Sequence, residues 1–305
     1  MAETFRPSDA NQITRNYLDS ILIEERLIDA EIPSTAFELY GEKFDTPIMT
    51  PAFSHLNVFA PERENGMCEY ARAAKNAGAV NWVGMGENPQ FGEIMEVGAK
   101  TIRIVKPYAD RNKVYDQIAY AEKTSALAVG IDIDHIFGND GGHDNVFGEE
   151  MTTQSRDEIK DFVRSTKLPF VIKGVLSVRD AVKCVECGVQ GIVVSHHHGR
   201  LPFAVPPLMV LPEIKKVVGD SLKIFVDCHI DTGADAYKAL ALGADAVSVG
   251  RAMMQPLVKE GAEGVEKLLK QMRDELALLM AFTGCKTLSD IEPTALWING
   301  RRCEK

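Results

Sequence analysis

The chain has 305 residues, of which 45% are hydrophobic and 26% are charged, and these values are ordinary for a globular protein. Its formal net charge of −10 at pH 7 argues against binding to nucleic-acid phosphates or to an anionic membrane, because both need a basic surface. No window approaches the ~18 apolar residues of a membrane span, and the six cysteines are scattered along the chain. We therefore expect a cytoplasmic protein with reduced thiols that binds neither nucleic acid nor membrane.

From residue 47 onward, short apolar runs alternate with amphipathic stretches. The runs suit parallel strands buried on both faces, and they cover residues 47–52, 80–85, 101–107, 126–134, 169–175, 191–197, 223–229 and 246–250. The stretches with helical patterns, several of which end in glycine, include residues 64–78, 111–125, 155–166, 178–188 and 233–244. Eight strand-then-helix units predict an α/β fold, a (β/α)8 TIM barrel in a single domain. A doubly wound sheet is the alternative, but no glycine-rich first turn supports it.

Three segments depart from this rhythm. Residues 1–45 form a short N-terminal extension, and residues 135–153 form a long polar loop after the fourth strand. A loop of this length in a compact domain is usually functional or mobile. Residues 261–283 are predicted as a long final helix. We see no internal linker, so residues 1–305 are predicted to be one domain.

Titratable residues gather at one end of the predicted barrel. All seven histidines fall just after a predicted strand or in the loop that follows one: His55, His135, His143, His196, His197, His198 and His229. Asp132, Asp134, Asp227 and Asp231 share those strand ends, Lys173 ends the fifth strand, and Arg251 follows the eighth. In this fold the chemistry lies at the carboxyl ends of the strands, so we expect a catalytic mouth there.

Two features of this mouth have chemical consequences. Lys173 lies in an otherwise apolar strand, "FVIKGV", and therefore needs an anionic partner. The segment "SHHHGR", residues 195–200, is compatible with a metal site, a proton-transfer site or a polar loop. Adjacent strand residues face opposite sides, so the three histidines cannot all converge if the strand continues.

Three segments resemble a known family. They are "LPFVIKGVLSVRDAVKCVECGVQGIVVSHHHGR", "IFVDCHIDTGADAYKALALGADAVSVGRAMM" and "MRDELALLMAFTGCKTLSDI". The sequence is similar to the FMN-dependent α-hydroxy acid oxidases and dehydrogenases, which include glycolate oxidase, lactate oxidase and flavocytochrome b2. The resemblance runs from about residue 47 to residue 292 and is strongest after residue 166.

The resemblance implies a (β/α)8 barrel with FMN across its mouth and assigns roles to residues. His197 would be the general base, with Asp132 as its partner, while Arg200 would grip a substrate carboxylate. Lys173 would lie beside flavin N1, where an ammonium stabilises reduced flavin. The implied cofactor-binding residues are Lys173, Ser195, Asp227, Gly250, Arg251, Pro51 and Ala52. The implied substrate-binding residues are Arg200, His197, Lys106 and Tyr108.

The sequence also departs from the family pattern. Lys106 replaces a tyrosine, which adds a cation and favours a small anionic substrate. Ile104 and Gly84 stand where the family has a glutamine and a serine that contact flavin. Asp231 stands where an arginine helps to hold the phosphate.

We therefore predict an FMN-dependent oxidoreductase that oxidises an α-hydroxy acid or a related anionic carbinol. One alternative is a metal-dependent lyase, hydrolase or isomerase, in which His55, His135 and His229 add to the ligands of the mouth. Others are an FMN-dependent isomerase without net oxidation and a barrel that binds without turnover. The resemblance also implies a homo-oligomer, with a tetramer as one form.

Overall fold

The structure is a computed structural model that describes residues 8–63 and 65–304, and a parallel sheet of eight strands lies at its centre. The strands are β4 (Ile48–Met49), β5 (Asn81–Val83), β6 (Thr101–Val105), β7 (Ala128–Asp132), β10 (Phe170–Val175), β11 (Gly191–Val194), β12 (Lys223–Val226) and β13 (Ala246–Ser248). Their order is β4-β13-β12-β11-β10-β7-β6-β5. Each predicted apolar run contains one of them, so the barrel prediction is confirmed.

The two edge strands, β4 and β5, approach each other and nearly close the barrel. The backbone N–H of Thr50 donates to the carbonyl of Val80 at 3.1 Å, and the N–H of Gly84 donates to Phe53 at 2.7 Å. The Thr50 hydroxyl accepts from the N–H of Trp82 at 3.0 Å. These bonds hold the strand ends of the mouth in one ring.

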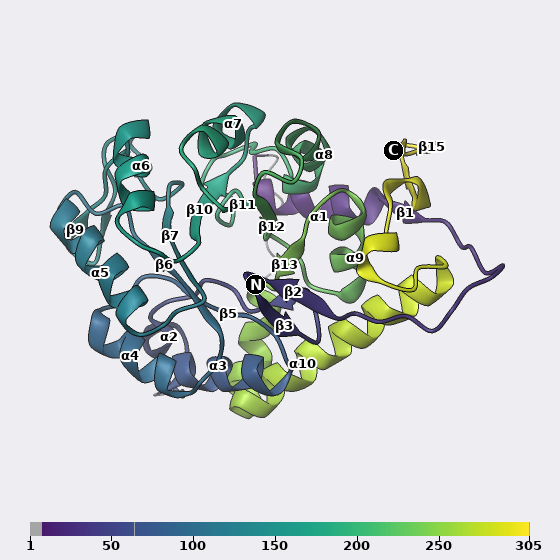
Figure 1. The fold of residues 1–305 in the computed structure, drawn as a ribbon, viewed down its shortest axis with the longest axis horizontal. Helices are drawn as coiled ribbons and strands as arrows, with labels where there is room; N and C mark the ends of the chain where they lie inside the picture. The colour runs from purple at the N-terminus through teal and green to yellow at the C-terminus, as the bar shows by residue number, and fades with distance from the viewer. Residues whose placement is uncertain (1–7, 64, 305) are drawn as a thin grey trace.

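Helices surround the sheet (Figure 1). They are α2 (Leu56–Phe59), α3 (Gly66–Asn76), α4 (Asn88–Glu96), α5 (Arg111–Lys123), α6 (Arg156–Arg164), α7 (Val178–Glu186), α8 (Pro207–Val218), α9 (Gly233–Ala241) and α10 (Met254–Phe282). Helices α6 and α9 each begin with a capping box, in which Ser155 and Thr232 are the N-cap residues. The final helix starts earlier than predicted because α10 continues across a non-helical Gly261 (φ 61°). Within the described part of the chain, no helix is long and apolar enough to cross a membrane.

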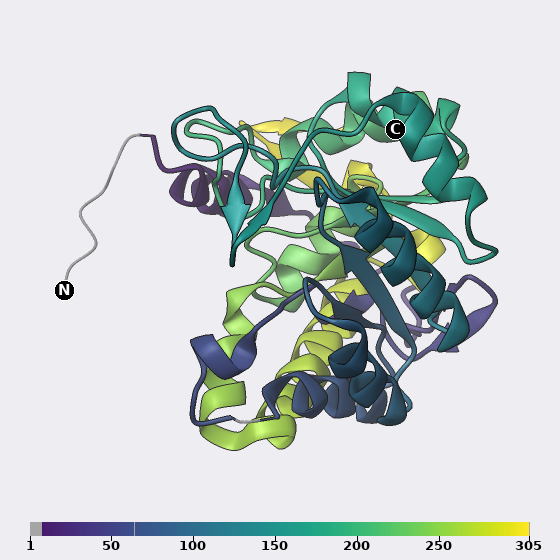
Figure 2. The same ribbon diagram turned by 90° about the vertical axis from the view of Figure 1, so that its left-hand side faces the viewer.

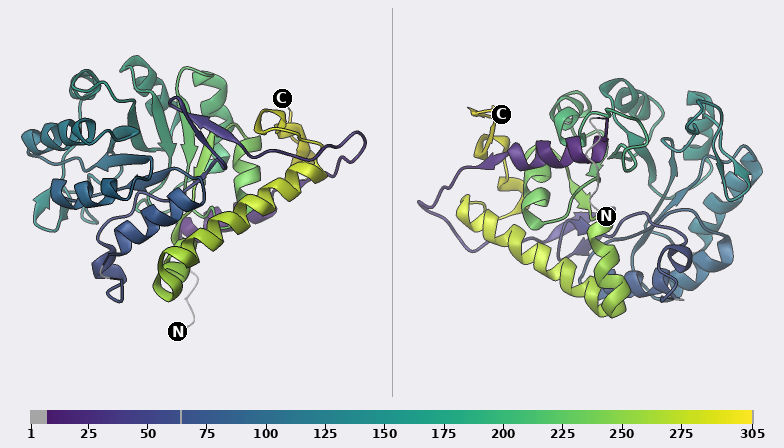
Figure 3. Two further views of the ribbon diagram at one scale, coloured as in Figure 1. Left: turned by 60° about the horizontal axis from the view of Figure 1, so that its bottom comes forward. Right: turned by 180° about the vertical axis from the view of Figure 1, so that it is seen from behind.

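The two ends of the barrel are covered differently. The hairpin of β2 (Phe37–Leu39) and β3 (Glu42–Phe44) lies at one end, and its apolar side chains join the barrel interior. Helix α1 (Ala10–Ser20) and the hairpin of β8 (Asn145–Val146) and β9 (Glu149–Glu150) lie at the other (Figures 2 and 3). The predicted polar loop 135–153 thus contains a small hairpin. A separate sheet joins β1 (Leu22–Ile23), β14 (Leu296–Ile298) and β15 (Arg301–Arg302).

Side chains along each strand alternate between the inside and the outside of the barrel, and this alternation determines which residues line the mouth. Inward-facing positions in the middle of the barrel hold apolar side chains such as Ile104, Val171, Val193 and Phe225, and glycine at Gly130. Because side chains alternate with a period of two, the residue two positions further along each strand also faces inward. Those next residues are Lys106, Lys173, Ser195, Asp227 and Asp132. The apolar core therefore ends in a layer of charged and polar groups.

The interior leaves no room at Gly130. A Cβ added there would lie 2.0 Å from the carbonyl oxygen of Val171 on the neighbouring strand. We expect Gly130→Ala to lower the free energy of unfolding by about 2–3 kcal/mol, because backbone must move to relieve the overlap. Urea denaturation of the purified protein measures this. The control, Gly142→Ala, meets only ordinary contacts and should change stability by less than about 0.5 kcal/mol; equal effects would contradict the packing.

Candidate active site

Two buried lysines and three carboxylates form the floor of the mouth. Lys106 Nζ lies 2.6 Å from Asp132 Oδ2. Lys173 Nζ lies 3.6 Å from Asp227 Oδ2 and 3.7 Å from Asp134 Oδ2. The buried Lys173 that the sequence singled out therefore has the anionic partners that its burial requires.

His197 stands over this floor on a tight turn after β11. Its backbone is left-handed (φ 46°), and its N–H donates to Ser195 Oγ at 3.1 Å. The ring Nδ1 lies 2.5 Å from Asp134 Oδ1 and 3.5 Å from Asp132 Oδ2. The resemblance pairs this histidine with Asp132, but in the structure the shorter contact is with Asp134, because Lys106 engages Asp132.

The two aspartates have opposite electrostatic environments. Burial acts to raise the pKa of Asp132, but the charges of Lys106 and His197 outweigh it and hold that pKa well below its usual value. Burial and the negative charge of Asp132 raise the pKa of Asp134 to about 6. The two acids therefore differ in how readily they hold a proton.

The cations of the mouth are also perturbed. Burial and Lys173 oppose the charged form of His197, yet Asp134 and Asp132 outweigh them, so its pKa is raised. Burial likewise acts to lower the pKa of Lys173, but Asp134 and Asp227 raise it, and the ammonium stays charged. A carboxylate-bound histidine beside a fixed ammonium is suited to proton transfer.

The three consecutive histidines have different surroundings. The buried ring of His196 accepts from the N–H of Gly199 through Nδ1 at 2.9 Å, and its Nε2 lies 2.8 Å from Thr14 Oγ1. His196 therefore fixes α1 against the turn as a neutral ring, in agreement with a pKa that burial lowers. His198 is exposed, and its carbonyl accepts from the Asn11 side chain at 3.1 Å.

Arg200 is held by the 135–153 loop. Its Nη2 donates to Asp144 Oδ2 and to the carbonyl of Phe137, both at 2.6 Å. Its Nη1 donates to His135 Nε2 at 2.9 Å. Burial and the charge of Lys106 lower the pKa of His135 to about 4, so His135 is neutral. The guanidinium of Arg200 is thus already hydrogen-bonded to residues of the loop, which the sequence did not indicate.

Some predicted contacts lie elsewhere. The ring of the buried Tyr108 packs under Lys113 of α5, whose Nζ lies 4.6 Å from the ring centroid, so we leave Tyr108 out of the site. Pro51 is buried and Ala52 half-buried directly after β4, at the mouth. Lys106 is at the mouth too, but its ammonium is engaged by Asp132 rather than free for a substrate.

A second group of polar side chains, Arg251 and the rings of His198 and His229, lies beside the end of β13. Gly250 is open, since a Cβ added there would have His229 N, at 4.0 Å, as its nearest neighbour. The rings of His229 and His198 are 6.3 Å apart, and Arg251 follows Gly250. Asp231, the acid expected to oppose a phosphate, has Arg15 Nη1 at 3.8 Å and His229 Nδ1 at 3.4 Å. Its charge is therefore partly offset by α1.

The described residues contain one set of side chains that could ligate a metal, formed by Asp132, Asp134 and His197. The ammoniums of Lys106 and Lys173 already face these carboxylates, so a cation would have to displace them. The additional ligands of the metal alternative are not in this set. His55 stacks on Phe147, His135 accepts from Arg200, and His229 faces Asp231. The arrangement does not favour a metal.

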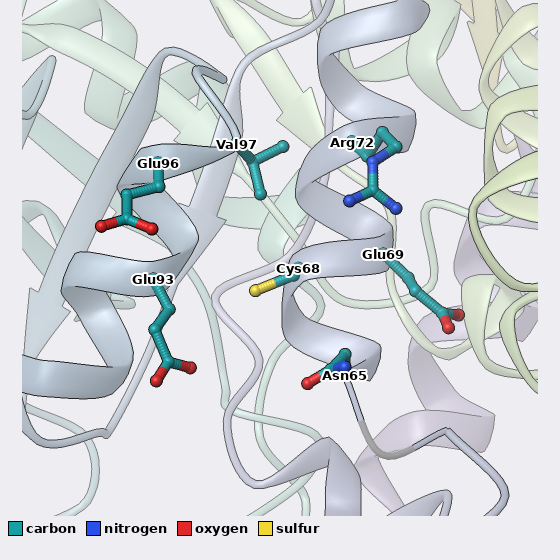
Figure 4. Close-up of a pocket in the computed structure, with 7 residues that line it drawn as sticks. All are labelled: Asn65, Cys68, Glu69, Arg72, Glu93, Glu96 and Val97. Atoms are coloured by element: carbon teal, nitrogen blue, oxygen red, sulfur yellow. The ribbon is translucent and has the colours of Figure 1, made fainter.

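A cavity of about 440 Å³ lies away from the mouth, between α3 and α4 (Figure 4). It is lined by Asn65, Cys68, Glu69, Arg72, Glu93, Glu96 and Val97. Burial and the charge of Glu93 raise the pKa of the Cys68 thiol, which disfavours the reactive thiolate. This cavity belongs to the outer helix layer and has no part in the charged floor.

Comparison with known proteins relates this site to a family. Residues 8–146 and 138–298 match the family described as FMN-dependent dehydrogenase. Glycolate oxidase of Spinacia oleracea is 30% identical over 315 residues, which cover 91% of this chain and 84% of that protein. L-lactate oxidase of Roseobacter sp. strain GAI101 is 38% identical over 150 residues, which cover 49% of this chain and 40% of that protein.

Solved structures share the fold. Mandelate oxidase with 3,3-difluoro-2-hydroxy-3-phenylpropionic acid superposes with a TM-score of 0.86 at 26% identity, covering 97% of this chain and 92% of that one. A mandelate oxidase variant with the C4a-OH-FMN adduct gives a TM-score of 0.87 at 26% identity, covering 97% and 93% of the two chains.

The raised pKa of Asp134 has a consequence for stability. Because the folded chain holds this proton more tightly than the unfolded chain, the stabilisation is complete below about pH 4 and is lost as the pH rises through about 6. We expect the stability of Asp134→Asn relative to the wild type to be about 1–3 kcal/mol more favourable at pH 8 than at pH 4, because the neutral amide avoids the cost of ionising this buried carboxyl group.

Urea denaturation of flavin-free protein at the two pH values measures this difference. The exposed Asp29→Asn is the control and should differ by less than about 0.5 kcal/mol at both. A loss of stability in Asp134→Asn that is the same at pH 4 and pH 8 would contradict the assignment.

Proposed function

The chain belongs to the FMN-dependent dehydrogenase family, and on that premise we propose that it oxidises an α-hydroxy acid to the 2-oxo acid with His197 as general base. The observation that carries the proposal is the 2.5 Å contact between His197 Nδ1 and Asp134 Oδ1, above the buried ammonium of Lys173. With Nδ1 engaged, Nε2 is the ring nitrogen left to accept a proton.

The residues of the mouth fit FMN. Lys173 offers a buried ammonium for the negative charge of reduced flavin, and Ser195 lies beside it, with its Oγ 3.5 Å from Lys173 Nζ. Gly250 offers open space for the phosphate, Arg251 offers a guanidinium, and the rings of His198 and His229 lie beside them. The buried Nε2 of His229 has no hydrogen-bond partner among the described residues, so it is free to donate to a phosphate oxygen.

The chain's own residues move the proton. Bound FMN supplies the two-electron acceptor that takes the hydrogen from C2 of the substrate. His197 Nε2 removes the proton of the hydroxyl group as the C–O bond gains double-bond character, and Asp134 stabilises the resulting imidazolium. The organic product would be the 2-oxo acid, and the two electrons would pass through the bound FMN to an external electron acceptor.

Among the cations of the mouth, Arg200 is the one held by the 135–153 loop. We propose that the carboxylate of the substrate binds Arg200, whose guanidinium can present two donors to a carboxylate. Asp144 now accepts from that guanidinium at 2.6 Å, so the substrate carboxylate would take its place. Lys106 is paired with Asp132 and therefore acts on the substrate through charge rather than by contact.

The proposal is tested by anaerobic titration of the FMN-loaded protein with a panel of hydroxy acids. Bleaching of the flavin absorbance with one 2-oxo acid formed per flavin supports it. Isomerisation of a substrate without bleaching would favour the FMN-dependent isomerase instead. We also propose that the protein is cytoplasmic. We propose that it forms a homo-oligomer, with a tetramer as one form, and light scattering of the purified protein measures this assembly.

Replacing His197 tests the base directly. We expect His197→Gln to slow flavin reduction by about 10²–10⁴-fold with little change in FMN affinity, because a positioned base contributes that much to the rate. Stopped-flow absorbance measures the reduction. His143→Gln, on the exposed part of the loop, is the control and should stay within about twofold. A loss below about tenfold in His197→Gln would remove it as the base.

Replacing Arg251 tests the phosphate end. We expect Arg251→Gln to weaken FMN binding by about 10–100-fold and to leave riboflavin binding unchanged, because only FMN carries the phosphate that the guanidinium would bind. Fluorescence titration of flavin-free protein with both flavins measures the ratio. Arg273→Gln, half-buried on α10 and paired with Asp274, is the control and should change neither. Equal weakening of both flavins would place Arg251 away from the phosphate.

A further inference from the structure

The carboxylate that the resemblance assigns to His197 is already engaged. Lys106 Nζ donates to Asp132 Oδ2 at 2.6 Å, and the backbone N–H of Asp134 donates to Asp132 Oδ1 at 3.2 Å. Both oxygens of Asp132 thus have donors before His197 is considered. The separation of 3.5 Å between Asp132 Oδ2 and His197 Nδ1 is too long for a good hydrogen bond.

Asp134, by contrast, points its carboxylate at the ring. Its Oδ1 lies 2.5 Å from His197 Nδ1, whereas its buried Oδ2 has Lys173 Nζ only at 3.7 Å and accepts no hydrogen bond from the described residues. His197 is therefore the main hydrogen-bonding partner of this side chain.

The backbone around Asp134 makes room for this contact. Strand β10 has an irregularity between Lys173 and Val175, and Gly174 within it is left-handed (φ 100°). A Cβ added at Gly174 would lie 2.5 Å from the Asp134 carboxyl carbon. The space left by the missing side chain is thus the space that Asp134 occupies.

From these contacts we propose that Asp134, and not Asp132, is the positioning residue of His197. It accepts the Nδ1–H hydrogen bond, fixes the tautomer in which Nε2 is unprotonated, and orients the ring toward the mouth. Lys106 contributes by holding Asp132 away from the ring. This role rests on the proposed function for its catalytic meaning, but the tautomer is a property of the chain alone.

The experiment compares matched variants by two readouts. Nitrogen-15 NMR of histidine-labelled, flavin-free protein reports which ring nitrogen of His197 carries the proton, and the signals are assigned from their loss in His197→Gln. We expect the Nδ1–H tautomer in the wild type and in Asp132→Asn, and a shift toward the Nε2–H tautomer in Asp134→Asn.

The second readout is flavin reduction in the loaded protein. We expect Asp134→Asn to lower the maximal rate by about 10²-fold or more with a small change in the half-saturating substrate concentration, and Asp132→Asn to lower it less. Asp134→Ser repeats the comparison with a different neutral side chain.

Each outcome has a distinct meaning. A tautomer shift in Asp132→Asn but not in Asp134→Asn would overturn the proposal in favour of Asp132, and no shift in either variant would overturn it as well. If no hydroxy acid reduces the wild-type flavin, the proposed function fails, while a tautomer shift in Asp134→Asn still supports the positioning role.

Discussion

The ion pair between Lys106 and Asp132 is the interaction on which the rest of the mouth depends. A carboxylate at 3% exposure without a partner would cost several kcal/mol, and the ammonium at 2.6 Å offsets that cost. Once Asp132 is engaged, Asp134 is the carboxylate left to pair with His197. Burial, together with the charge of Asp132, raises the pKa of Asp134 to about 6. Lys173 then balances Asp134 and Asp227 together. The positions and protonation of the site therefore follow from one pair.

These charges are tolerable because the barrel places them at the end of its core. Successive inward-facing residues of a strand are two positions apart, and here an apolar residue is followed directly by a charged or polar one. The ionic layer therefore packs directly on buried apolar residues such as Val171 and Phe225. Helix α1 covers one side of this layer through Thr14 and Arg15, which contact His196 and the β12 loop. The N-terminal segment is thus part of the site.

Much of this organisation could be predicted from the sequence. The apolar runs identified all eight strands, and the lysine within "FVIKGV" identified a buried charge, because both signals are local. The shorter contact of His197 with Asp134 was not predicted, because it depends on the left-handed Gly174 and on the turn at His197, and the sequence near these two residues does not indicate Asp134 as the partner. Contacts from Thr14 and Arg15 join residues far apart in the chain, and no pattern in the sequence links them.

The most direct test of this arrangement is a crystal structure of the FMN-loaded protein with a hydroxy acid bound. The central claim predicts that His197 Nδ1 stays within hydrogen-bond distance of Asp134, that Lys106 stays on Asp132, and that Nε2 faces the substrate hydroxyl. A structure in which His197 pairs with Asp132 while Lys106 turns to the substrate would contradict it.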